Sequence, residues 1–176
     1  MREAAAPTLR TERLLLRPFQ AADEDRYTAI LADPLNVRYL PGGAAGATRA
    51  AEKARRLVED WGGAAWAAGP RPWAVELPGA GLIGHLGLRF LSELGETELL
   101  YLLDRPHWGR GFATEGARAA IAFARDRLAL QYLVALALPE NSGSILVLRR
   151  CGFALEGPVH VLGLDAVRYG LPLRPL

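Results

Sequence analysis

Hydrophobic and polar positions switch along this chain between the spacing of helices and the spacing of strands. Apolar or small residues recur at intervals of three and four over 114–128, which predicts a helix. These positions are Ala117, Ala120, Ile121, Ala124 and Leu128. Apolar runs at 99–103 and 132–138 flank this helix, and each has the length of a buried strand. The pattern therefore predicts a β-α-β unit whose two strands pair in parallel or are splayed apart.

The other elements follow from periodicity, caps and turn residues. Strands are predicted over 13–19, 72–77, 81–90, 96–103, 132–138, 153–162 and 164–171. Helices are predicted over 23–32, from Thr48 as N-cap to Trp61, over 114–128, and from Asn141 or Ser142 to Gly152. The glycine-rich stretch 41–47 is a loop by composition. The predicted order is β-α-α-β-β-β-α-β-α-β-β, an α+β arrangement with a mixed sheet of about seven strands and about four helices.

Composition narrows the class of protein. With 51% hydrophobic residues, the 176-residue chain has enough apolar material for one domain with a sizeable core. A formal charge of +2 argues against a strong nucleic-acid binder. The single cysteine, Cys151, excludes an intramolecular disulfide, and the three histidines lack metal-ligand spacing, so no metal is expected. Because no signal-peptide pattern opens the chain and 128–138 is too short to span a bilayer, we expect a cytoplasmic protein with no membrane partner.

The segment His107–Glu115 carries the most informative chemistry. It joins a predicted strand to a predicted helix, and it contains Gly109 and Gly111. A glycine loop before a helix aims unpaired N–H groups and the positive helix end at an anion. Glycine also lets the backbone approach a phosphate closely. Because many such glycine pairs are only turns, this segment by itself leaves a phosphate cradle and an ordinary turn as equal alternatives.

Five motifs follow one another along the chain. They are T-E-R-L-L-L-R-P at 11–18, E-L-L-Y-L-L at 98–103, W-G-R-G-F-A-T-E at 108–115, N-S-G-S at 141–144 and G-F at 152–153. Together they resemble the GNAT superfamily of acyl-CoA-dependent N-acyltransferases, and in particular its RimJ/RimL-like branch, which acetylates protein N-terminal amines and various small amines. The resemblance covers about residues 9–171, which implies one GNAT-fold domain with tails at 1–8 and 172–176.

The resemblance implies acetyl-CoA as cosubstrate and a primary amine as acceptor. The acceptor is either the N-terminal α-amine of a protein or peptide, or a small-molecule amine, and it attacks the thioester directly in a ternary complex. The implied cofactor-binding residues are Leu102, Leu103, Trp108, Gly109, Arg110, Gly111, Phe112, Ala113, Thr114, Asn141 and Ser144. Backbone amides of 109–114 would hold the pyrophosphate, while Arg110 is equally well explained as a solvated loop residue, and Asn141 as a helix cap. Trp108 stands where the wider superfamily carries Arg or Gln, and the RimJ/RimL-like branch tolerates it.

Glu98 is the candidate general base, acting through an ordered water. A carboxylate that enters an apolar run is unusual, and burial would raise its pKa toward a useful value. Strand alternation puts Glu98 and Tyr101 on opposite faces, unless a bulge shifts the parity. The alternative is that Glu98 lies at the solvated end of the strand beside Glu96.

A general acid is harder to identify. Many family members carry a tyrosine seven residues after the asparagine of the N-x-x-S motif, and that position is Leu148 here. Tyr101 and Tyr169 remain as candidates, although a CoA thiolate is a fair leaving group unaided, with a pKa of about 8.5 on the cysteine scale. Glu115 lies in the first turn of its helix, where a carboxylate interacts well with the dipole, so a structural role is favoured over catalysis.

Amine protonation favours some acceptors over others. An α-amine with a pKa of about 7.8 is neutral far more often at pH 7 than a lysine amine of about 10.4, so α-amines or other low-pKa amines are favoured. The acceptor pocket would be walled by the N-terminal helices, the loop 41–47 and the last hairpin. Three tryptophans near that wall, Trp61, Trp66 and Trp73, are more typical of packing than of recognition.

One other function remains open, and another is disfavoured. Leu148 in place of tyrosine favours a catalytically silent acyl-CoA-binding or sensor protein. A dinucleotide-binding loop requires an acidic residue about 20 residues further on, and Asp126 falls inside the helix instead. A homodimer through the last hairpin or a sheet edge rests on the general frequency of symmetric dimers.

Overall fold

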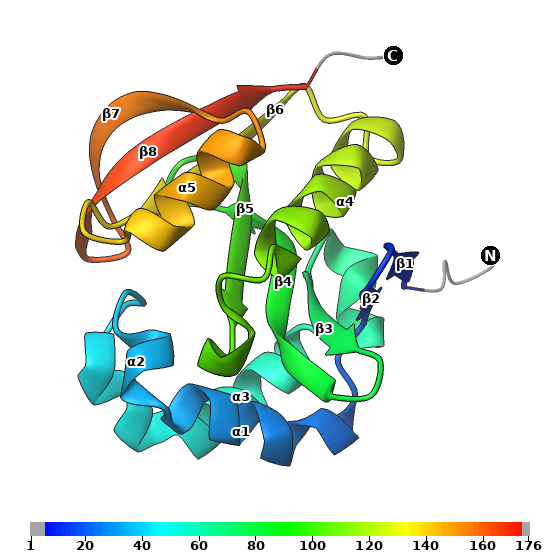
Figure 1. Cartoon of the computed structure of the whole chain (residues 1–176). Coiled ribbons are helices and arrows are strands. Elements are labelled where there is room, and N and C mark those ends of the chain that lie inside the picture. The colour runs from blue at the N-terminus through cyan, green and yellow to red at the C-terminus, as the bar shows by residue number, and fades with distance from the viewer. Residues whose placement is uncertain (1–5, 174–176) are drawn as a thin grey trace.

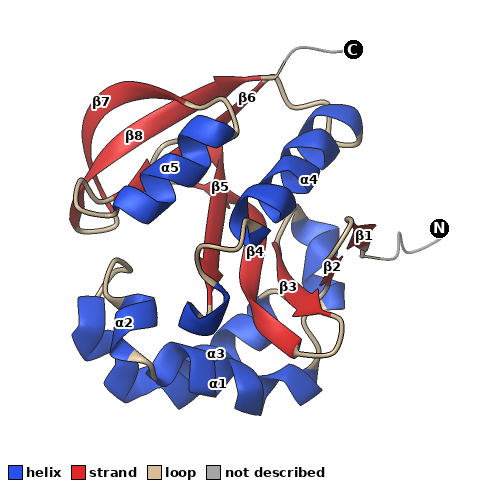
Figure 2. Cartoon of the chain, in the orientation of Figure 1, coloured by secondary structure: helices blue, strands red, loops and turns tan. Residues whose placement is uncertain are grey.

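Strands whose central members are buried on both faces form a mixed eight-stranded sheet in the computed structural model, which describes residues 6–173 (Figures 1 and 2). The strand order is β1-β2-β3-β4-β5-β6-β8-β7. The strands are β1 (Leu9–Arg10), β2 (Leu15–Arg17), β3 (Pro72–Leu77), β4 (Gly81–Leu91), β5 (Glu96–Leu103), β6 (Tyr132–Ala137), β7 (Ala154–Val161) and β8 (Leu164–Pro172). The predicted α+β class, with a mixed sheet flanked by helices, is confirmed.

Within residues 6–173, five α-helices accompany the sheet. They are α1 (Glu24–Ala32), α2 (Pro34–Val37), α3 (Ala50–Asp60), α4 (Phe112–Asp126) and α5 (Ser142–Arg150). Single 3₁₀ segments lie at Ala21–Asp23, Gly43–Arg49, Gly63–Ala68 and Arg105–His107. In Figure 1, α1, α2 and α3 lie together at one end of the molecule, while α4 and α5 lie above the other part of the sheet. Within the described residues, no helix has the length and apolar character needed to cross a membrane.

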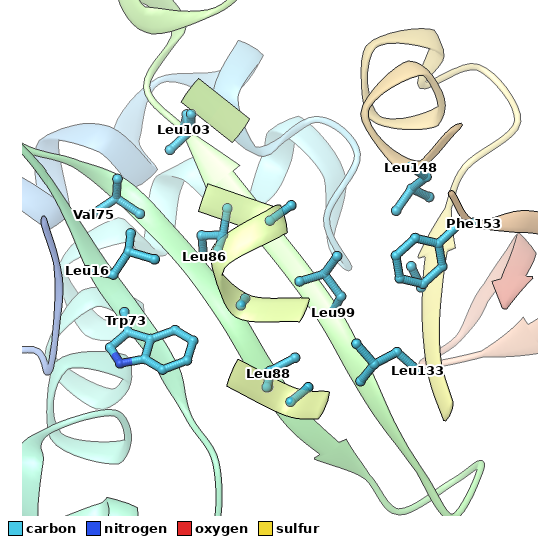
Figure 3. Packing of buried hydrophobic residues seen from close by; sticks show 14 of the residues in the cluster. Leu16, Trp73, Val75, Leu86, Leu88, Leu99, Leu103, Leu133, Leu148 and Phe153 are labelled. Carbon is cyan, nitrogen blue, oxygen red and sulfur yellow. The ribbon is translucent and has the colours of Figure 1, made fainter. Parts of the chain in front are cut away.

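The sheet has a hydrophobic core on each face. One core joins the strands to α4 and to the end of α5, and Figure 3 shows Leu86 and Leu99 of neighbouring strands together with Leu148 and Phe153. The other core joins the sheet to α1 and α3, and Leu102 reaches it from β5. A Cβ on Gly116 of α4 would lie 2.9 Å from a methyl group of Leu86, so glycine allows this helix to approach the sheet closely.

A β-bulge in β4 sets which of its side chains face α1 and α3. Val75 of β3 pairs with Gly84, and the next residue pairs with Leu82, so Ile83 is the extra residue. Gly84 has a φ of +150°, and a Cβ there would lie 2.1 Å from the carbonyl oxygen of Leu102. The bulge considered for β5 is absent from its pairing with β4, which is regular from Gly84–Leu103 to Leu91–Glu96.

The two parallel strands are splayed, as the sequence allowed. β5 and β6 pair in parallel at a single position, Glu98 with Val134. Beyond Glu98, the residues of β5 have no cross-strand partner in β6, while β6 continues its pairing with β8 as far as Ala137. This divergence leaves β5 and β6 unpaired with each other after Glu98 and Val134.

Several boundaries differ from the sequence predictions. The sheet has eight strands rather than about seven, because Leu9–Arg10 pairs with β2 at one edge. The short helix α2 was not predicted; Pro34 occupies its first turn and the Asp33 carboxylate accepts a hydrogen bond from the N–H of Leu35.

Helix ends also differ. Thr48 does not cap α3, because its hydroxyl donates to the carbonyl of Ala45 inside the 3₁₀ segment that replaces the expected loop. Helix α4 starts at Phe112, two residues earlier than predicted, since Gly111 with a φ of +81° occupies the N-cap. Gly152, with a φ of +89°, follows α5 as predicted. Of the expected tails, Pro172 belongs to β8, and the parts at 1–5 and 174–176 lie outside the described residues.

Candidate functional site

The segment between β5 and α4 forms a turn that is exposed at residues 109–111. Gly109 and Gly111 have φ values of +70° and +81°, a left-handed conformation that residues with a Cβ rarely adopt. The first bond of the helical ladder runs from the N–H of Glu115 to the carbonyl of Gly111, at 3.0 Å. The N–H groups of residues 112–114, which precede Glu115 in the helix, therefore have no acceptor within the helix. They form the positive end of the helix dipole. This arrangement suits a phosphate or a similar anion, which favours the cradle over the plain turn.

Contacts from distant segments hold this cradle in place. The indole Nε1 of Trp108 donates to the carbonyl of Leu103 at 2.6 Å, which fixes the loop to the end of β5. The guanidinium of Arg13 donates to the carbonyl of Arg110 at 3.0 Å and lies over the ring of Phe112 at 4.5 Å. The Arg110 guanidinium also lies over that ring, 4.9 Å from its centroid. Trp108 and Arg110 thus have structural contacts of their own.

Glu115 anchors the N-terminal motif to the first turn of α4. Its Oε1 accepts hydrogen bonds from the Thr11 hydroxyl at 2.5 Å and from the Arg13 N–H at 2.8 Å. Its Oε2 accepts from the Arg13 side chain at 2.7 Å. Burial opposes ionisation, but these hydrogen bonds prevail and lower the pKa of Glu115. The favoured structural interpretation of Glu115 agrees with this geometry, whereas its partners were not found from the sequence.

A second set of contacts fixes the end of β5 against the N-terminal helices. Asp104 accepts hydrogen bonds from the Asn36 amide at 2.9 Å and from Arg26 at 2.6 Å. The carbonyl oxygen of the Asn36 amide accepts from the N–H of Arg105 at 2.9 Å. The helix α2, which periodicity alone missed, therefore positions the loop that leads into the cradle.

A cavity of about 1100 Å³ connects the cradle with the space under α1 and α3. Its wall includes most of the residues expected from the sequence: Glu98, Tyr101, Leu102, Leu103, Trp108, Gly109, Gly111, Phe112, Ala113, Thr114, Asn141 and Ser144. Arg110 is the expected residue that is not part of this wall. The wall also includes parts of 38–46 and the turn of the last hairpin, as the expected acceptor pocket would.

The N-terminus of α5 meets β5 at the cavity. The Asn141 side chain accepts from the N–H of Ser144 at 3.1 Å, so the predicted N-cap is confirmed. The Tyr101 hydroxyl donates to the carbonyl of Ser144 at 3.0 Å and lies 2.9 Å from its Oγ. Burial raises the pKa of Tyr101, so this hydroxyl keeps its proton at neutral pH. Leu148 is buried in the cavity wall, whereas Tyr169 is packed in the core.

Glu98 is buried, so the alternative of a solvated strand end is wrong. Its residue is only 5% exposed, and Oε2 accepts two hydrogen bonds from Arg89, at 3.0 Å and 2.8 Å. Arg89 is its direct cross-strand partner in β4. Burial raises the pKa of Glu98, and the Arg89 charge opposes that effect without cancelling it. The result is a carboxylate inside the cavity with a pKa above its ordinary value.

His85 is a cavity residue that the sequence did not single out. Its Nδ1 lies 2.8 Å from the Tyr27 hydroxyl, and its ring lies 4.9 Å from that of Trp61. Burial, followed by the nearby charges of Arg89 and Lys53, lowers the pKa of His85 to about 3. The imidazole is therefore neutral at physiological pH. No local pattern marks it, because its position depends on the bulge in β4.

The tryptophans divide between packing and the site. Trp66 and Trp73 pack together in the core, with ring centroids 4.9 Å apart. Trp61 belongs to the other core and also contributes to the cavity wall. In the part of the chain that the structure describes, no three His, Cys, Asp or Glu side chains gather in a way that suits a metal ion.

Comparisons with known proteins agree on one family. The family model described as acetyltransferase (GNAT) domain matches residues 13–154. The uncharacterized N-acetyltransferase p20 of Bacillus licheniformis is 30% identical over 151 residues, which cover 85% of this chain and 84% of that relative. A crystal structure of an acetyltransferase from Agrobacterium tumefaciens str. C58 has 31% identity and a TM-score of 0.75, with 94% of each chain covered. The ribosomal L7/L12 α-N-protein acetyltransferase RimL, solved in complex with coenzyme A, shares the fold at 15% identity and a TM-score of 0.73, with 96% of this chain and 98% of that chain covered.

Proposed function

Since this chain belongs to the GNAT acetyltransferase family, we propose that it transfers an acetyl group from acetyl-CoA to a primary amine by direct attack in a ternary complex. One observation carries this proposal: a single cavity runs from the free N–H groups at the start of α4 to the buried carboxylate of Glu98. An anion site and a base at the two ends of one cavity are what a reaction between a phosphate-bearing donor and an amine requires.

Acetyl-CoA fits the described residues. The pyrophosphate binds the backbone N–H groups of 109–114, where glycine conformations leave the N–H groups accessible. The pantetheine arm lies in the gap between β5 and β6, next to Asn141 and Ser144. The structural neighbour RimL, which was solved with coenzyme A, supports the choice of cosubstrate.

Glu98 acts as the general base through a water molecule. Because burial raises the pKa of this carboxylate, it is a stronger base than an exposed glutamate. The amine nitrogen bonds to the carbonyl carbon, the C–S bond breaks, and the amine proton passes through the water to Glu98. A backbone N–H of β5 beyond Glu98 polarises the thioester carbonyl.

The departing CoA thiolate needs no dedicated acid and takes its proton from solvent. Leu148 stands at the position where many family members have a tyrosine, and the Tyr101 proton is engaged with the carbonyl of Ser144. A thiolate with a pKa of about 8.5 leaves readily at neutral pH. Tyr101 is thus a weaker candidate for catalysis than Glu98.

The acceptor is an α-amine or another amine of low pKa, as in the RimJ/RimL-like branch. With one modest base and no dedicated acid, the site favours an amine that is already neutral in an appreciable fraction at pH 7. The reaction takes place in the cytoplasm, where acetyl-CoA is available to such an enzyme.

Binding and turnover measured on the same protein test this function. Calorimetric titration with acetyl-CoA is expected to show micromolar binding, while NAD is expected not to bind. Release of CoA thiol is then measured with peptides bearing a free N-terminus and with small amines. Binding without turnover of any amine would favour the catalytically silent acyl-CoA binder, and no binding would exclude both functions.

A further inference from the structure

Cations gather at the acceptor end of the cavity. Lys53 and Arg56 of α3 and Arg89 of β4 contribute to the cavity wall on the side of α1 and α3. Arg89 is engaged with Glu98, through two hydrogen bonds to one oxygen. Among residues 6–173, neither Lys53 nor Arg56 forms an ion pair or a side-chain hydrogen bond. The same cavity wall therefore carries these three positive charges and the buried carboxylate of Glu98, which Arg89 alone of the three contacts.

The mutual repulsion of Lys53, Arg56 and Arg89 favours binding of an anion. Half-burial is the main reason why the pKa of Lys53 is lowered, and the charges of Arg56 and Arg89 lower it further. The charges of Arg89 and Lys53 also lower the pKa of His85, which places them near the same part of the cavity. Like charges that share a partly buried site repel one another, and a bound oxyanion would relieve that repulsion.

The neighbouring acidic residue does not supply this anion. Glu52 precedes Lys53 on α3, but its carboxylate is held by Arg49 through two hydrogen bonds at 3.0 Å and 2.8 Å. Both of those side chains are largely exposed at the rim. Half-buried Lys53 and exposed Arg56, which both border the cavity, are left for a group that enters it. Lys53 is also the only lysine in the chain, so no other lysine duplicates its role.

We propose that Lys53 and Arg56 bind an oxyanion of the acceptor, so that the preferred substrate is an amine that carries a carboxylate. This inference rests on the proposed acetyl transfer. Arg89 connects the base to the proposed anion site. It forms an ion pair with Glu98, and its charge lowers the pKa of Lys53. The carboxylate and the reacting amine therefore belong to one small unit, either a free amino acid or the acidic first residue of a peptide.

Matched acceptors test the inference. The specificity constant kcat/KM, calculated on the concentration of neutral amine because a free carboxylate raises the amine pKa, is measured by thiol release for alanine against alaninamide, and for a peptide beginning with Glu against the same peptide beginning with Gln. The wild-type protein is expected to prefer the carboxylate member of at least one pair by about tenfold or more, which corresponds to one well-placed charge contact. The pair that discriminates identifies the source of the carboxylate, a free amino acid or an acidic peptide terminus.

Variants of α3 test whether Lys53 and Arg56 cause the preference for acceptors that carry a carboxylate. Lys53→Met and Arg56→Gln are expected to reduce the ratio of the two specificity constants several-fold each, mainly through KM for the anionic acceptor. Lys53→Arg is expected to keep the ratio. Arg55→Gln is the matched control, because Arg55 is an exposed neighbour on the same helix and is not part of the cavity wall. Calorimetric binding of acetyl-CoA confirms that each variant is folded.

The outcomes separate the two proposals. Turnover without discrimination between the matched acceptors, or a preference that survives in the Lys53→Met/Arg56→Gln double variant, overturns the anion site and leaves the acetyl transfer standing. Absence of turnover with every acceptor overturns the proposed function, and the anion site with it.

Discussion

Replacing Glu115 separates a structural role from a catalytic one. Its carboxylate is 16% exposed and accepts hydrogen bonds from Thr11 and Arg13 across more than 100 residues of sequence separation. Glu115→Ala removes the hydrogen bonds from the Thr11 hydroxyl and the Arg13 N–H, worth about 0.75 kcal/mol each because water replaces part of the loss at this partly exposed site. The ion pair with Arg13 adds at most about 1 kcal/mol, since the Arg13 side chain is 43% exposed and is screened by solvent.

The expected loss of unfolding free energy is therefore about 2 kcal/mol for Glu115→Ala and about 1 kcal/mol for Glu115→Gln, which keeps one acceptor oxygen. At this chain length, 1 kcal/mol corresponds to about 3 °C, so Tm falls by about 6 °C and about 3 °C. Thermal unfolding at pH 7 measures both values. Glu12→Gln is the control, because it removes the same charge from an exposed position in the same N-terminal segment.

The pH dependence of the loss follows from the direction of the pKa shift. The pKa of Glu115 in the folded protein is below its ordinary value of 4.5, so its stabilisation is complete above that value and is lost as the pH falls through the lower folded pKa. The difference in Tm between wild type and Glu115→Gln is expected to be constant from pH 6 to pH 8 and to shrink below about pH 4.5.

Activity provides the refuting result. At a temperature where both proteins are folded, Glu115→Gln is expected to keep kcat within a few-fold of wild type. A fall in kcat of about a hundredfold with an unchanged Tm, which is the size expected on removing a general acid or base, would show that Glu115 takes part in the chemistry and that its contacts with Thr11 and Arg13 are incidental.

Three further predictions concern the cradle, the base and the buried tyrosine. Gly111→Ala forces a Cβ into a φ of +81°, at a cost of about 1–2 kcal/mol, so acetyl-CoA binding measured by calorimetry should weaken by up to about thirtyfold; unchanged binding would argue against the cradle. Because the pKa of Glu98 is raised and its base form is the active one, kcat/KM should rise with pH through a value above 4.5, and Arg89→Met, which removes the opposing cation, should move that rise to higher pH. An unmoved profile in Arg89→Met would exclude Glu98 as the titrating base. Tyr101→Phe loses the hydrogen bonds to Ser144 and should lower the unfolding free energy by about 1 kcal/mol, while kcat falls less than tenfold; a larger fall in kcat, measured under saturating acetyl-CoA, would identify Tyr101 as a general acid.

Local features of the sequence were sufficient for most elements and for the cradle. The three-four spacing over 114–128 predicted α4, because a helix that packs on a sheet needs one apolar face. Gly111 and Gly152 mark positions with positive φ, which few other residues adopt, and Asn141 has the side chain of an N-cap. These signals depend only on neighbours in the chain, so they are readable without the fold. The order of motifs likewise indicated the family.

Only the tertiary structure decided how the site is assembled. Thr11 and Arg13 meet Glu115, and the partner of Glu98 is Arg89, because strand register and helix packing bring these segments together. No periodicity encodes such pairs. The burial of Glu98 contradicted the alternative of a solvated strand end for the same reason: exposure depends on what covers a residue.

Three further features could not be predicted from the sequence: the edge strand β1, the short helix α2 and the position of His85. A two-residue strand and a four-residue helix are too short to show a period, and they exist because β2 and Asp104 offer them partners. His85 faces α1 because one extra residue in β4 shifts the alternation. The sequence by itself determined the local conformations and the glycine turn before α4, whereas the charges in the cavity wall came together only when distant segments packed.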